Sequence, residues 1–105
     1  MARVPFGYRQ EGDQWAIDAE QAAVVRRIFA EFTRLYAHAG LTEIAEGLNV
    51  DAIPTQRGGQ WHASTVRYIL SNAGYVGGAQ PAIISREQHD QAQARLNRMQ
   101  MGPTR

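Results

Sequence analysis

The sequence predicts a small, mainly α-helical domain that begins with a short β-hairpin. Apolar residues recur at helical spacing in four stretches, and "PFGYRQEGDQWAID" alternates apolar and polar residues as strands do. Glycine and proline interrupt the chain between these stretches. With 105 residues, the chain is long enough for one domain with a modest core.

The alternating segment is expected to form the hairpin. Phe6 and Tyr8 would share one face, Trp15 and Ile17 another, and Glu11-Gly12-Asp13 would form the turn. Because a lone hairpin is marginally stable in water, it should lie against the helices that follow.

The longest apolar stripe predicts a helix over about Ala19 to Ala39. Asp18 should cap its start, with Gln21 three residues on, and Gly40 should end it. The apolar positions that should form the spine of the core are Val25, Ile28, Phe29, Phe32 and Tyr36.

A pair of short helices follows, joined by the loop "DAIPTQRGGQ". Thr42 is the expected cap of the first helix and Asn49 its expected left-handed end, while Ile53 should anchor the loop in the core. The inward residues of the first helix should be Ile44, Ala45 and Leu48, and those of the second, "WHASTVRYIL", should be Ala63, Val66, Ile69, Leu70 and Ala73. Trp61 and Tyr75 are expected to be packing residues.

The last third of the chain predicts one more helix. Ala82 to Ile84 is expected to be a short extended piece, and Ser85 with Gln88 should cap a helix over about Arg86 to Met101. Its thin apolar stripe should be His89, Ala92, Leu96 and Met99. Residues 102–105 are expected to form a disordered tail.

Positive charge is concentrated around the second short helix. Up to Asp51, five arginines stand against eight acidic residues, whereas the stretch from Ala52 to Arg86 has three arginines and no acid. This pattern is typical of a surface that faces a polyanion. All eleven basic residues are arginine, which a GC-rich codon bias would also produce, so the placement of the charge is the evidence.

Residues for catalysis or metal binding do not stand out. The chain has no cysteine, and its three histidines lack partners at ligand spacing. "RGGQ" has neither the spacing nor the lysine of a phosphate loop. Neither a bilayer-spanning run nor the pattern of a signal peptide is present. We therefore expect a cytoplasmic domain without catalytic residues, cofactor, metal or membrane contact.

The helix pair resembles a helix-turn-helix with a long connection, whose second helix would enter the major groove of double-stranded DNA. The residues expected to contact DNA are Arg9, Thr55, Gln56, Arg57, Gln60, His62, Ser64, Thr65, Arg67 and Tyr68. The alternative is a protein–protein interaction domain, in which the basic helix face meets an acidic partner and Phe29 and Tyr36 supply a binding stripe.

The order of the motifs resembles the recombinase domain of large serine recombinases, a family of phage integrases and transposon resolvases. The stretches that carry the resemblance are "VPFGY", "VVRRIFAEF", "IAEGLNVDAIPTQRGGQWHASTVRYILSNAGYVG" and "AIISREQHDQAQARL". One departure is Asp51-Ala52, where the family more usually has a residue followed by glycine.

The resemblance implies that residues 1–101 form a DNA-binding module that recognises part of an attachment-site half. Its partners would be that DNA and the other domains of a bacterial or phage-encoded parent recombinase: a preceding catalytic serine domain and a following zinc ribbon, both outside this chain. Residues 1–5 resemble the linker from the catalytic domain, and Arg3 would probe the DNA backbone or minor groove there.

Overall fold

The structure is a computed structural model that describes residues 4–35 and 39–101. Arg3, Tyr36 and the expected tail, residues 102–105, lie outside the described residues. The elements in chain order are β1 (Tyr8–Glu11), β2 (Gln14–Ile17), α1 (Ala19–Thr33), α2 (Leu41–Val50), α3 (Ala63–Leu70), the 3₁₀ turn η1 (Ala73–Val76) and α4 (Arg86–Met101). The predicted mainly α-helical fold with an N-terminal hairpin is confirmed.

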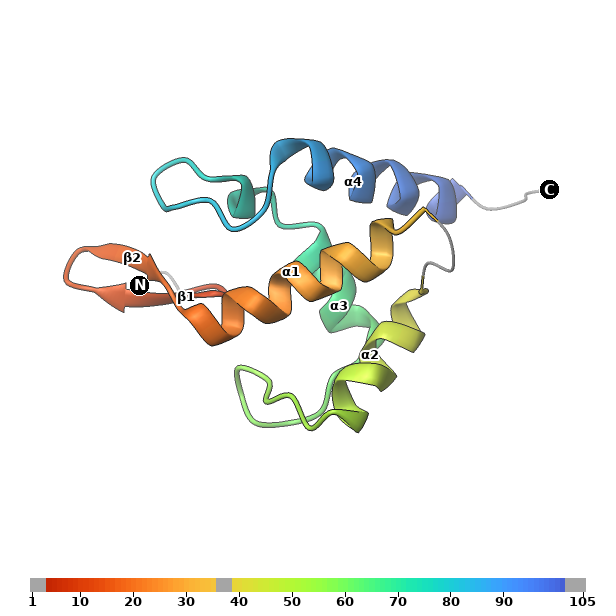
Figure 1. Cartoon of the computed structure of the whole chain (residues 1–105), viewed down its shortest axis with the longest axis horizontal. Helices are drawn as coiled ribbons and strands as arrows, with labels where there is room; N and C mark the ends of the chain where they lie inside the picture. Colours follow the sequence, from red (N-terminus) through yellow and green to blue (C-terminus); the bar gives the residue numbers. More distant parts are fainter. Residues whose placement is uncertain (1–3, 36–38, 102–105) are drawn as a thin grey trace.

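Helix α1 is the central element of the fold. It packs against α2, α3 and α4, and in Figure 1 α3 passes behind it while α4 and α2 lie to its two sides. Its start is capped as predicted, because Asp18 Oδ1 accepts a hydrogen bond from the backbone amide of Gln21 at 3.0 Å. The side chains that it buries are Ala22, Val25, Ile28, Phe29 and Phe32.

The prediction that α1 extends to Ala39 was wrong, because the helix ends at Thr33. Two donors from outside the helix reach its last carbonyls: the Ala39 amide bonds Glu31 O and the Arg95 guanidinium bonds Phe32 O. These donors replace the amides of a further helical turn. Gly40, expected to end α1, is instead the N-cap of α2.

Both expected end residues of α2 were also wrong. Thr42 lies inside the helix, and the cap is Gly40, whose amide donates to Glu43 Oε1 at 2.8 Å. The left-handed position after the helix is Ala52, with φ of 57°, rather than Asn49. A Cβ in that conformation costs about 1–2 kcal/mol, a cost that glycine would avoid at this position.

The hairpin forms, but its two apolar pairs do not lie on different faces. Tyr8 pairs with Ile17 and Gln10 pairs with Trp15, and directly paired residues point to the same side of a sheet. Tyr8 and Trp15 therefore share one face, with their ring centroids 6.1 Å apart. Gly12, with φ of 60°, lies in the turn.

Tyr75 joins the hairpin to the helices. Its side chain is buried, its ring stacks on Tyr8 at 6.0 Å and meets Phe29 edge-on at 6.3 Å. Its hydroxyl donates to Phe6 O at 2.6 Å. Burial raises the pKa of this phenol well above its ordinary value, so the hydroxyl stays a neutral donor.

The chain before α4 forms no strand, contrary to the prediction for Ala82 to Ile84. The amides of Ile83 and Ile84 both donate to Tyr75 O, and both side chains are buried. The Ser85 cap is confirmed, since its Oγ accepts from the Gln88 amide at 3.0 Å. Two residues predicted to face inward, Ala73 and Met99, are exposed instead.

Phe32→Ala should lower the free energy of unfolding by about 3–5 kcal/mol, because the removed ring leaves a cavity in the core. The Phe32 side chain is fully buried and the Arg95 guanidinium lies 4.2 Å from its ring centroid. Chemical denaturation measures the loss. Leu35→Ala is the control, because Leu35 is 87% exposed and its truncation should change stability by no more than about 0.5 kcal/mol. A loss below about 1 kcal/mol for Phe32→Ala would contradict its place in the core.

Candidate DNA interface

Helix α3 has one side in the core and one side turned outward. Val66, Ile69 and Leu70 are buried, and Trp61, just before the helix, is also buried as predicted. The residues on the other side, all predicted to contact DNA except Ser71, are Ser64, Tyr68 and Ser71, which are exposed, and Thr65 and Arg67, which are half-buried. These five residues, the outer face of α3, are held in place by the buried side.

The side-chain amide of Asn49 fixes the point at which the chain enters α3. Asn49 Oδ1 accepts from the Trp61 amide at 2.8 Å, and Asn49 Nδ2 donates to the Trp61 carbonyl at 2.9 Å. One side chain thus pairs with both backbone polar groups of one residue, as a neighbouring strand would. The sequence assigned Asn49 only to a helix end, and no local pattern indicated this long-range role.

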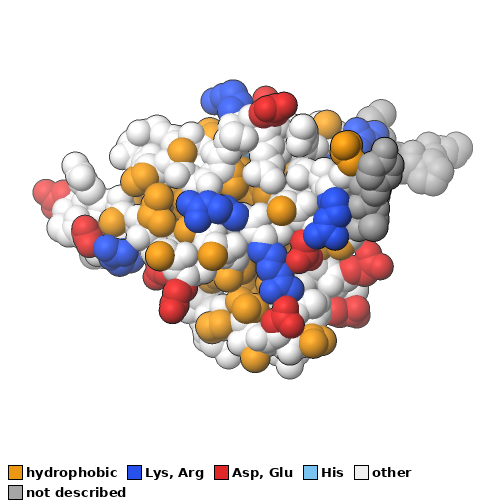
Figure 2. Space-filling view, in the orientation of Figure 1, with side chains coloured by type: hydrophobic (Ala, Val, Ile, Leu, Met, Phe, Trp, Pro, Cys, Tyr) orange, Lys and Arg blue, Asp and Glu red, His pale blue; other side chains and the backbone are white. Residues whose placement is uncertain are grey.

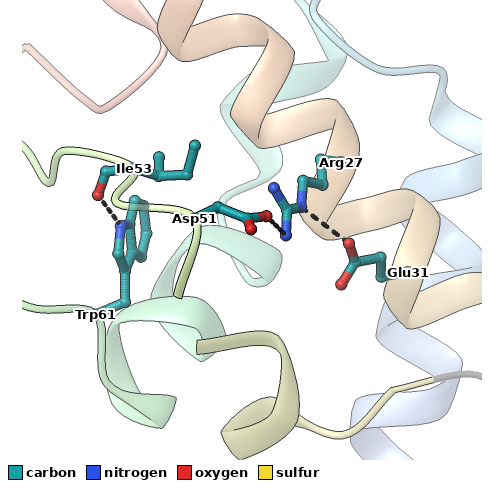
Figure 3. A network of polar contacts seen from close by, with 5 residues as sticks. All are labelled: Arg27, Glu31, Asp51, Ile53 and Trp61. Atoms are coloured by element: carbon teal, nitrogen blue, oxygen red, sulfur yellow. Dashed lines mark hydrogen bonds and ion pairs between the residues drawn. The ribbon is translucent and has the colours of Figure 1, made fainter. Parts of the chain in front are cut away.

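The indole of Trp61 closes the same loop from inside. Its Nε1 donates to Ile53 O at 2.9 Å, and its ring meets Phe6 edge-on at a centroid distance of 5.4 Å. Figure 3 shows Trp61 beneath the loop with its nitrogen aimed at this carbonyl. Ile53 itself packs against the core, as predicted.

An ion-pair network ties the start of the loop to α1. Arg27 lies 2.7 Å from Asp51 and 2.9 Å from Glu31, so it bridges the end of α2 and the outer side of α1 (Figure 3). Burial lowers the pKa of Arg27, but the hydrogen bonds to Asp51 and Glu31 outweigh that effect and raise the pKa above its ordinary value. The guanidinium therefore stays charged, although each partly exposed pair contributes little by itself.

The loop between these anchors presents two of its predicted contact residues to solvent, Arg57 and Gln60. Thr55 is half-buried, and its Oγ1 donates to Gly59 O at 3.3 Å. Gln56 is exposed but engaged, because its Nε2 donates to Val4 O at 2.7 Å and holds the N-terminal segment against the loop.

The remaining two predicted contact residues are His62, directly before α3, and Arg9, in β1. His62 is exposed and is the N-cap of α3, where its side chain makes no capping hydrogen bond. Arg9 belongs to the hairpin, where it lies 2.7 Å from Glu11 and donates to Ile17 O at 2.7 Å. The structure therefore groups the loop and α3 residues together, and it engages Arg9 within β1 and β2.

Charge is distributed differently on the two sides of α1. Figure 2 shows the side on which α1 lies, where arginines are interspersed with aspartates and glutamates. From Ala52 to Val76, the chain that forms the rest of the loop, α3 and η1 carries Arg57 and Arg67 and no acidic residue. A polyanion thus meets less repulsion at α3 than at the acid-bearing side of α1.

Among the residues that the structure describes, no group of three metal-ligating side chains comes together. None of the helices in the described part is long and apolar enough to cross a membrane.

The sequence profile of the Recombinase family matches residues 19–99, and the chain belongs to this family. Its fold is similar to that of a chain in a crystal structure of a large serine recombinase (LSR)–DNA complex, with a TM-score of 0.78 at 22% sequence identity. That similarity covers 99% of this chain and 35% of the other, so this chain spans about a third of that length. No curated protein matches the sequence. The resemblance of the motifs to a recombinase domain is confirmed.

Asn49→Ala should destabilise the protein by about 1–3 kcal/mol, because it leaves two partly buried backbone groups of Trp61 without partners. Hydrogen exchange of the Trp61 amide should accelerate more than exchange of the Ile28 amide in α1. Glu46→Ala, an exposed change on the same helix, is the matched control. Unchanged exchange at Trp61 would contradict the role assigned to Asn49.

Proposed function

We propose that this chain is the DNA-binding module of a site-specific serine recombinase and that it recognises part of an attachment-site half in double-stranded DNA. The observation that carries the proposal is the outer face of α3, a solvent-facing row of hydroxyl, guanidinium and phenol groups on a helix whose other side is buried. Membership of the Recombinase family supports the same function.

The outer face has the chemistry that base recognition in the major groove requires. The groove admits one helix, in which arginine bonds guanine through two donors and hydroxyls bond several base edges. Ser64, Thr65 and Arg67 lie within the first five residues of α3, the part of a recognition helix that meets bases. We assign base contacts to these three residues.

The loop before α3 supplies the groups for the DNA backbone. Arg57 and Gln60 are exposed beside the start of α3, and His62 stands at its N-cap, close to the positive end of the helix dipole. Phosphate contacts of this kind fix the position of a protein on DNA without reading its sequence. Arg9 and Gln56 remain predicted contacts with DNA, and each also donates a hydrogen bond to the protein's own backbone.

Strand exchange is assigned to the parent recombinase rather than to this chain. The proposed division leaves DNA recognition to α3 and its loop and catalysis to another domain, and affinity for the whole site would come from linked modules. Arg3, which lies outside the described residues, remains a predicted contact with the backbone or minor groove.

The alternative function, binding to a protein partner, depends in part on an exposed apolar stripe on α1. Phe29, expected to supply part of a binding stripe on α1, is fully buried against Tyr75 and His89. No described residue of that stripe faces solvent, so α1 gives the alternative no apolar contact surface.

Arg67→Ala should weaken binding to the preferred duplex by about 1–3 kcal/mol and reduce base preference at one position, because a guanine-edge contact carries sequence information. The duplex is first selected with the wild-type chain from a pool with a randomised central segment. Affinities for the selected and a scrambled duplex are then measured by fluorescence anisotropy. Wild-type affinity and preference in this variant would remove Arg67 from the interface.

Arg57→Ala should weaken binding to both duplexes alike and reduce the slope of log K against log salt by roughly one unit, because a phosphate contact releases a counterion. Arg34→Ala is the control for the loss of one positive charge, since Arg34 is exposed at the C-cap of α1. Equal effects of the two variants would show that net charge, rather than the loop, governs binding. A wild-type chain that binds neither duplex would exclude the proposed function.

A further inference from the structure

Tyr68 is the large apolar side chain of the outer face of α3. It is 72% exposed, and no hydrogen bond joins its hydroxyl to a residue that the structure describes. It follows Ser64 by one helical turn, so it points to the same side as this proposed base contact. The packing of the domain gives no reason for an aromatic ring here.

Two hollows flank the ring of Tyr68. One, of about 440 Å³, lies between Tyr68, Pro5, Tyr8 and Asn72. The other, of about 220 Å³, lies between Tyr68, Pro5, Thr55 and Trp61. The ring therefore stands clear of its neighbours on two sides, with room for a group of a partner to pack against it.

The described lining of both hollows is uncharged. Among the described residues that line them, none is an arginine, lysine, histidine, aspartate or glutamate. A phosphate placed against Tyr68 would find no cation among the described lining residues, whereas the desolvation of an uncharged group costs far less. The surroundings of Tyr68 thus favour a neutral, partly apolar part of the DNA.

We propose that Tyr68 is a specificity-determining residue that recognises thymine through its 5-methyl group. The inference rests on the proposed function, because it places the outer face of α3 in the major groove. There, the apolar group that distinguishes one base from the others is the methyl of thymine. Tyr68 packs its ring on this methyl, while Arg67 and Ser64 make the polar contacts beside it.

The test is a double-mutant cycle, in which the methyl group is removed from the DNA, the ring is removed from the protein, and binding affinity is measured for each combination. The probe is the duplex selected from the randomised pool, in which thymines are replaced one at a time by deoxyuridine, which lacks the methyl. Wild-type affinity should fall about threefold to fivefold at one thymine, the effect of one buried methyl-sized group. Tyr68→Phe, which keeps the ring, should show the same loss at the same thymine.

Tyr68→Ala should have the same affinity for the duplex that contains thymine as for the duplex that contains deoxyuridine at that position. Tyr68→Gln, a second ring-free variant, should do the same, and circular dichroism checks that each variant is folded. The inference would be overturned if both ring-free variants lost as much affinity as the wild-type chain when deoxyuridine replaces thymine. It would also be overturned if no such replacement weakened binding by the wild-type chain. Equal weakening of every duplex by the ring-free variants would assign the ring to deoxyribose instead and would also overturn it.

These outcomes are separate from the outcome that would exclude the proposed function. A wild-type chain that prefers the selected over the scrambled duplex retains the DNA-binding function whatever Tyr68 does. A wild-type chain without that preference loses the sequence-recognising function, and the thymine contact with it.

Discussion

The placement of α3 depends on the pairing of the Asn49 side chain with the backbone of Trp61. The connection between α2 and α3, residues 51–62, is much longer than a tight turn, and ordering so long a loop costs conformational entropy. Three hydrogen bonds offset that cost: two between the Asn49 side chain and the Trp61 backbone, and one from the Trp61 indole to Ile53 O. They hold the backbone at Ile53 and at Trp61, the two ends of the segment that carries Arg57 and Gln60. The positions of these two exposed side chains are therefore restricted by the fold.

Some arginines hold the fold, and others lie in the segment proposed to contact DNA. Arg27 ties α2 to α1, and Arg95 donates to Phe32 O and Ala39 O, which ties α4 to the connection between α1 and α2. Burial, together with the nearby Arg98, lowers the pKa of Arg95 from its ordinary value. Arg57 and Arg67 lie in the acid-free segment instead. Composition alone does not separate the two groups, because a guanidinium bonds a carbonyl and a phosphate through the same donors.

The sequence predicted what local periodicity determines. The four helices, the bounds of α4, the caps at Asp18 and Ser85, and the burial of Trp61 and Tyr75 followed from spacing and side-chain type. The misplaced features depend on partners far along the chain. Arg95, 63 residues from Phe32, bonds the last turn of α1, and the role of Asn49 depends on a residue 12 positions away. The site was predicted as a set of residue types on one helix face, whereas the anchoring that orients this face was not.

The segment from Val4 to Phe6 contributes both to the core, through Tyr75, and to the surroundings of Tyr68. Phe6 O accepts from the buried Tyr75 hydroxyl, and Val4 O accepts from Gln56, so the segment from Val4 to Phe6 is held at both ends. Pro5, between them, lines both hollows beside Tyr68. The wall that faces the exposed ring is therefore bonded to the core through Phe6 and to the loop through Val4. Such preorganisation would reduce the entropy lost in the proposed contact with a base. A change at Tyr75 would thus disturb recognition indirectly, through the position of Pro5, while a change at Tyr68 would act on the base itself.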